Sequence, residues 1–246
     1  MLRAAPDTIS FFVLLRLIHT AFSFFAFCSF AQSDSFLVFL DQRLMSKVMP
    51  PWYRFLITTL SLYLPKFGVQ ILTPYANKVG LHGLLKMVIQ LSILVSILAL
   101  VVGRHLFYVW GILVVVQRFL LSSWGFYDLV MADVIDADRV KYQRKKSVAT
   151  SVHGVQSLIV KPAQSLAPMC GIWILSITGV SDSELAGQST TVGEDNGAVG
   201  SQRNGVYWLT FGLPLVCSLC QLWIWSKWKL KGKQLMEVKR RVKELL

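Results

Sequence analysis

The chain has 246 residues, of which 54% are hydrophobic and only 15% are charged, and its mean hydropathy is +0.54. A soluble domain carries roughly 25% charged residues, and so short a chain could not enclose this much apolar surface. The same composition excludes an intrinsically disordered protein. The 4 cysteines are too few to staple a small secreted scaffold. We therefore predict an all-α integral membrane protein.

Six apolar blocks are long enough to cross a bilayer, whose core of ~30 Å takes ~20 helical residues. Long uncharged stretches within them favour helices over buried strands. The first block could be read as a signal peptide, but it is too long, and Arg16 and His19 interrupt it. We expect one domain of six transmembrane helices over residues 1–230, with spans at about 9–33, 53–77, 84–103, 105–134, 147–178 and 205–228.

The net charge of +12 comes from 25 basic and 13 acidic residues, and its distribution indicates topology. Basic residues crowd the link at 139–146 and the tail from 227 onward, whereas the link at 179–204 is mainly acidic. Because cytoplasmic loops of membrane proteins are rich in Lys and Arg, we predict that both chain termini are cytoplasmic. The charge excess is then explained by topology, and we expect no nucleic-acid partner.

The tail at 231–246 has the pattern of an amphipathic helix. Leu235, Val238, Val242 and Leu245 recur at helical spacing, with lysine and arginine between them. Such a helix can lie on the anionic inner leaflet of a membrane. The alternative is a frayed, solvated tail.

Ionisable residues inside predicted spans are costly, so they indicate a polar cavity, an ion path or a partner. We assign to a substrate or ion pathway the residues Arg16, His19, Arg118, Asp128, Asp133 and Lys161.

The fifth span is the most informative, because its small and polar residues recur every three or four positions. This stripe consists of Thr150, Gly154, Ser157, Lys161, Ser165 and Pro168. Small residues also mediate close helix packing in membranes. Packing does not require a lysine, however, whose unpaired charge is expensive to bury. We therefore favour a water-lined path along this stripe.

The fourth span offers possible countercharges. Arg118, Ser122, Gly125, Asp128 and Asp133 share an arc somewhat wider than a third of an ideal helix. We expect Asp128 to pair with Lys161 or Arg118, which would offset part of the desolvation cost of both charges. A purely structural ion pair between two helices is the alternative.

No enzyme signature is present. The sequence has no Gly-x-Ser-x-Gly nucleophile turn and no glycine-rich phosphate loop. The 4 histidines share no metal-ligand spacing, and Cys217 and Cys220 lie in an apolar span without a second ligand pair. We predict neither an enzyme nor a protein that holds a metal or cofactor.

Three segments together resemble the sugar–cation symporter branch of the major facilitator superfamily. The first, Asp133-Val-Ile-Asp136, ends a span and precedes a basic loop. The second is Leu158-Ile-Val-Lys161-Pro-Ala-Gln-Ser-Leu-Ala-Pro168. The third, at 74–83, is similar to the short cytoplasmic turn after the second helix of each facilitator half.

This resemblance implies that the chain corresponds to the second six-helix half of a twelve-helix transporter, which holds its solute between two halves. It places Lys161 near the family's cation site, whereas the acidic residues that chiefly bind the cation belong to the first half. At the cytoplasmic gate or loops we place Asp136, Asp138, Arg139 and Lys78.

We expect the protein to be all or part of a secondary transporter that moves a small solute by alternating access. The alternative is a non-transporting membrane scaffold of facilitator descent. A lone six-helix half would expose its cavity face to lipid. We therefore expect either a partial product of a longer gene, whose missing first half covers this face, or self-association.

Overall fold

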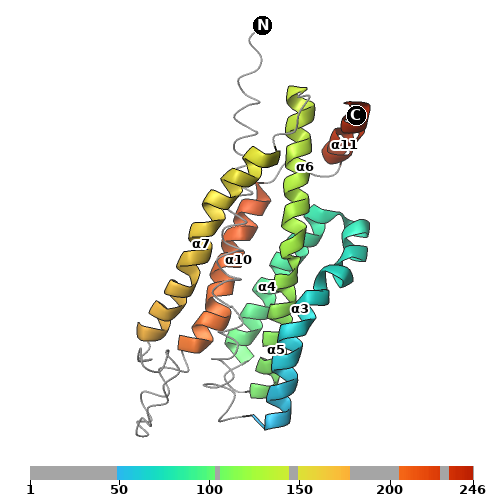
Figure 1. Ribbon diagram of the computed structural model, residues 1–246. Helices are drawn as coiled ribbons and strands as arrows, with labels where there is room; N and C mark the ends of the chain where they lie inside the picture. Colours follow the sequence, from blue (N-terminus) through green and yellow to red (C-terminus); the bar gives the residue numbers. More distant parts are fainter. Residues whose placement is uncertain (1–48, 103–105, 144–148, 178–204, 228–232, 246) are drawn as a thin grey trace.

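The computed structural model describes residues 49–102, 106–143, 149–177, 205–227 and 233–245, and every regular element within these ranges is helical. The predicted first span, with Arg16 and His19, lies outside the described residues, as does the acidic link at 179–204. The long helices lie side by side in an elongated bundle (Figure 1). They are α3 (Pro51–Val79), α4 (Leu81–Val102), α5 (Phe107–Leu120), α6 (Trp124–Tyr142), α7 (Ala149–Ile177) and α10 (Leu213–Ser226), with α11 (Lys233–Leu245) in the tail.

Four helical segments of the described chain are long and apolar enough to cross a membrane. They are Pro51–Val79, Leu81–Val102, Tyr108–Tyr142 and Gly205–Ser226. These segments correspond to four of the predicted spans, and they confirm an all-α integral membrane protein. The predicted fifth span forms α7, whose 29 residues include Pro162 and Pro168. It is not among the four, so the number of six spans stays a prediction.

The second and third spans are joined more tightly than the sequence suggested. The expected turn at 74–83 is largely helical, because α3 continues through Pro74 to Val79. The chain reverses direction mainly at Gly80, whose φ of 82° is unfavourable for residues with a side chain. Pro65 and Pro74 lie inside α3, and Figure 1 shows its second half bending away from the bundle.

The fourth span is interrupted by a change of helix type. A 3-10 turn, η2 (Leu121–Ser123), separates α5 from α6. The helical run then continues to Tyr142, past the predicted end at residue 134, and Gln143 caps it in the left-handed conformation. At 1.5 Å per residue the run is about 50 Å long, which exceeds a bilayer core of about 30 Å. The last turns of α6 therefore extend beyond the apolar layer.

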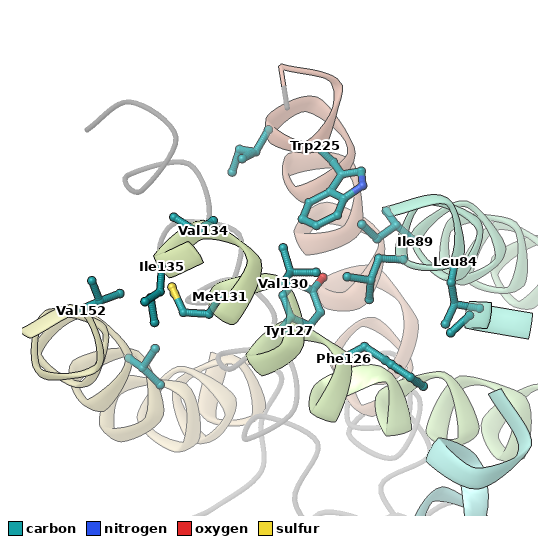
Figure 2. Packing of buried hydrophobic residues seen from close by; sticks show 14 residues of the cluster. Leu84, Ile89, Phe126, Tyr127, Val130, Met131, Val134, Ile135, Val152 and Trp225 are labelled. Atoms are coloured by element: carbon teal, nitrogen blue, oxygen red, sulfur yellow. The ribbon is translucent and has the colours of Figure 1, made fainter. Parts of the chain in front are cut away.

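Two clusters of buried side chains hold the helices together. One joins α4, α6, α7 and α10 around Tyr127, Met131 and Trp225 (Figure 2). Within it the indole Nε1 of Trp225 donates a hydrogen bond of 3.2 Å to the carbonyl of His82.

The other cluster includes Trp110 and Phe211 and the π-helical turn η3 (Trp208–Gly212). Tyr53 Oη donates to the Tyr108 carbonyl at 2.6 Å, and Tyr207 Oη donates to the Ala99 carbonyl. These bonds tie α3 to α5 and the last span to α4.

Candidate functional site

The helix α7 has one face that packs into the bundle. The buried residues recur at helical spacing and are Val152, Gln156, Val160, Ala167 and Gly171. Val152 and Val160 join the cluster around Met131. A side chain at Gly171 would meet Leu209 of η3. Figure 1 shows α7 at the edge of the bundle, and this buried face provides its contacts with the other described helices.

The rest of α7 is divided between a polar face and an apolar face. Every residue of the predicted polar stripe is exposed: Thr150, Gly154, Ser157, Lys161, Ser165 and Pro168. A second exposed set is apolar and includes Val155, Leu158, Leu166, Met169 and Trp173, while exposed Ile172 ends the polar stripe beyond Pro168. At about 100° per residue, the buried, polar and apolar sets each take roughly a third of the helix circumference.

Lys161 lies at the centre of the polar face. Its ammonium group forms no ion pair with any residue that the structure describes. Proline has no N–H, so Pro162 and Pro168 leave the carbonyls of Leu158 and Gln164 without their usual helical donors. The hydroxyl of Ser165 donates to the Lys161 carbonyl at 3.1 Å. The mid-section of α7 is thus rich in polar groups with spare hydrogen-bonding capacity.

Asp128 does not form the ion pair that the sequence suggested. It is exposed on α6 and has no ion-pair partner within the described ranges, whereas Arg118 is buried near the end of α5. The five residues expected on one arc are therefore split between buried and exposed positions. The helices on either side of η2 bury different faces, because Arg118 lies on a buried face of α5 and Asp128 on an exposed face of α6.

Asp128 and Lys161 nevertheless lie at a similar height along the bundle. Both are displaced along the helix axes to the same side of the place where α6 packs on α7. Ile135 of α6 and Val152 of α7 belong to one cluster and are neighbours in Figure 2. Asp128 precedes Ile135 by seven residues, or about 10 Å, and Lys161 follows Val152 by nine residues, or about 14 Å. Because the two helices run antiparallel, both exposed charges lie at similar depth.

Asp133 takes part in a different contact, with the C-terminal helix. Its carboxylate is 2.9 Å from the ammonium of Lys239, and the Asp133 side chain is 11% exposed against 51% for Lys239. The predicted amphipathic helix is present as α11, which packs on α6, as Figure 1 shows. The half-buried residues of α11 include Leu235, Val238 and Val242, which are three of the four predicted for its apolar face.

The sequence analysis missed Lys239 as a partner of Asp133. The two residues are 106 positions apart, so no local spacing could connect them. Three of the four residues predicted at the cytoplasmic gate lie toward the end of α6: Asp136 and Arg139 are half-buried and Asp138 is buried. Lys78 is exposed in the last turn of α3.

We predict that the Asp133–Lys239 pair holds α11 on α6. Asp133→Asn removes the charge and leaves the tail sequence intact, so trypsin should cleave the tail about fivefold faster, the equivalent of about 1 kcal/mol. The matched control is Asp136→Asn, one turn away on the same helix, which should leave the cleavage rate unchanged. Equal rates for all three proteins would show that the pair does not hold the tail.

Comparisons with known proteins identify relatives but no family model that matches the chain. The chain is 25% identical over 229 residues to Transmembrane protein 180 of Gallus gallus. It is also 25% identical over 225 residues to Transmembrane protein 180 of Mus musculus. In both cases the match covers 86% of this chain and 43% of the relative. The chain thus spans less than half the length of these relatives. Together with the apolar helices, they indicate a multi-pass membrane protein.

Proposed function

We propose that this multi-pass membrane protein supplies one wall of a polar path through the bilayer, as all or part of a secondary transporter for a small solute. The observation that carries this proposal is the polar face of α7, which is exposed along its whole length and has Lys161 at its centre. Alternating access would move the solute past Lys161 and Asp128. Arg118 is buried near the end of α5, so we assign it no direct contact with the solute.

The energetic argument rests on where the polar face can lie. A lysine facing hydrocarbon near the centre of a span costs ~2.5–3.5 kcal/mol on insertion scales. The neighbouring apolar face of α7, with Leu158 and Met169, is suited to lipid. The polar face is therefore best accommodated against water or against a second polar surface. Exposed Asp128 at similar depth adds a charge of opposite sign to the same region.

Two kinds of covering surface are compatible with this proposal. The relatives extend beyond the matched segment, so they have further chain that could cover the corresponding face. The facilitator resemblance at 133–168 implies the same arrangement, with a first six-helix half opposite this one. A second copy of the chain is the other candidate. We place α11 and the last turns of α6 on the cytoplasmic side, and the two helices pack on one another.

Thiol modification tests the transport proposal with neighbouring positions on α7. In a background without the native cysteines, Ser157→Cys is placed on the polar face and Leu158→Cys, where the wild-type residue is 75% exposed, on the apolar face. Uptake of a panel of isotope-labelled solutes is measured before and after treatment with a charged methanethiosulfonate. We expect modification at 157 to block uptake and treatment at 158 to leave it unchanged. Uptake unaffected at both positions would contradict the proposal.

A membrane scaffold is the second candidate, and α11 is the observation that favours it. This helix exposes Arg240 and Arg241 while its other side packs on α6, which suits an anionic lipid surface or an acidic partner. A scaffold would tolerate loss of Lys161 and fail when α11 is deleted. A transporter would show the reverse sensitivity.

A further inference from the structure

A small cavity with both polar and apolar lining residues lies inside the bundle. It lies between α4, the junction of α5 with α6, and α10, and its volume is ≈ 20 Å³. No residue of α7 lines it. Its polar lining consists of Ser92, Gln117, Ser123, Tyr127, Ser218 and Gln221.

Hydrogen bonds organise one wall of this cavity. The amide Nε2 of Gln117 donates to Ser92 Oγ at 3.0 Å, and the hydroxyl of Ser218 donates to the same oxygen at 3.0 Å. Three helices are therefore joined through Ser92. The bond to Ser92 fixes the orientation of the Gln117 amide group. The carbonyl oxygen Oε1 at the other end of this group takes no part in that bond.

Two buried polar atoms on the cavity remain to be satisfied. Gln117 is 2% exposed and Ser123 is 1% exposed. Neither Gln117 Oε1 nor Ser123 Oγ has a hydrogen-bond partner among the residues that the structure describes. Buried polar groups in proteins are overwhelmingly paired with protein or ordered water. An acceptor and a hydroxyl that line one cavity therefore indicate a ligand that both donates and accepts.

We propose that this cavity binds a single water molecule. The water donates a hydrogen bond to Gln117 Oε1 and accepts one from the hydroxyl of Ser123. The cavity exceeds the ~10–15 Å³ that one water needs, and its lining offers the two to four polar partners that buried water typically has. The lining residues carry no charge, which disfavours a cation, because an ion in an apolar layer requires countercharge. The water bridges α5 to the 3-10 turn where the fourth span changes helix type.

The sign of a stability change tests this site. If water occupies the cavity, Ser123→Ala removes a hydrogen bond, and the melting temperature of the full chain in detergent should fall by roughly 2–4 °C. If the cavity is dry, the same change removes an unsatisfied hydroxyl and should raise the melting temperature. The matched control is Ser96→Ala on α4. Its hydroxyl is buried without a partner among the described residues and does not line the cavity, so its melting temperature should not fall.

Three outcomes are then distinguishable. A fall for Ser123→Ala alone, equal in sodium and in choline buffers, supports the bound water. A rise that matches Ser96→Ala shows that the cavity is dry and overturns the proposal. A fall that occurs in sodium but vanishes in choline assigns the site to a monovalent cation and also overturns the proposal. Because no α7 residue is involved, the result is independent of the transport proposal.

Discussion

Replacement of Lys161 by alanine is expected to abolish solute uptake while the protein still inserts into membranes. Lys161 carries the positive charge at the centre of the polar face of α7 and has no ion-pair partner among the described residues, so it is available to a solute or ion in the path. A charged solute in the path would form such a pair with Lys161, and truncating one partner of a desolvated charge pair costs about 2–5 kcal/mol, or a loss of roughly 30-fold or more. The measurement is uptake of a panel of isotope-labelled solutes, normalised to the amount of protein in the membrane.

A lysine in the candidate span formed by α3 provides the control. Lys66 follows Pro65 in α3, and its ammonium lies 5.2 Å from the centre of the Tyr63 ring, a contact that helps to accommodate its charge. Lys66→Ala should therefore retain uptake, and Lys161→Arg should retain part of it. Unchanged uptake in Lys161→Ala would remove this residue from the mechanism and favour the scaffold.

Replacement of Gly68 by alanine is expected to destabilise the bundle. Gly68 is buried where α3 crosses η2, and an added Cβ would fall well inside van der Waals contact with the side chain of Ser122. Forcing extra atoms into a packed contact costs about 1–3 kcal/mol. We expect a lower melting temperature in detergent, by roughly 2–4 °C for each kcal/mol.

Gly154 supplies the comparison for this effect. It lies in α7, and an added Cβ there would have no atom within 4 Å. Gly154→Ala gains helix propensity without a clash, so the melting temperature should stay constant or rise. If Gly68→Ala also leaves the melting temperature unchanged, α3 does not approach η2 as closely as the structure shows.

The sequence predicted best what depends on local periodicity. The stripe through Ser157, Lys161 and Ser165 is recognisable because an α-helix repeats every 3.6 residues, and α7 is helical throughout this stretch. The same reasoning predicted an ion pair for Asp128 that the described residues do not form, because tertiary packing decides which face of each helix is buried. It also missed the 3-10 turn that separates α5 from α6. Nothing in the local pattern marks residues 121–123 as different from the helices on either side.

Helix ends and long-range contacts were beyond the sequence. Charged residues after position 132 indicate where the apolar layer ends, but α6 continues as a helix to Tyr142 because nothing there stops it. The resemblance at 74–83 suggested a turn, yet α3 continues for five residues past Pro74 before Gly80. The contacts of Asp133 with Lys239 and of Ser92 with Ser218 join distant segments, and tertiary packing alone brings them together.

The central claim is that the polar face of α7 borders water while its exposed apolar face borders lipid. The most direct measurement is electron paramagnetic resonance of single spin labels at positions 165 and 166, in the protein reconstituted into bilayers. Oxygen concentrates in lipid and a nickel chelate stays in water, so the ratio of their collision rates reports the surroundings of each label. We predict that the label at 165 favours the nickel chelate and that the label at 166 favours oxygen. If the label at 165 collides with oxygen as often as the label at 166 does, the polar stripe lies in lipid. That result would contradict the proposed path.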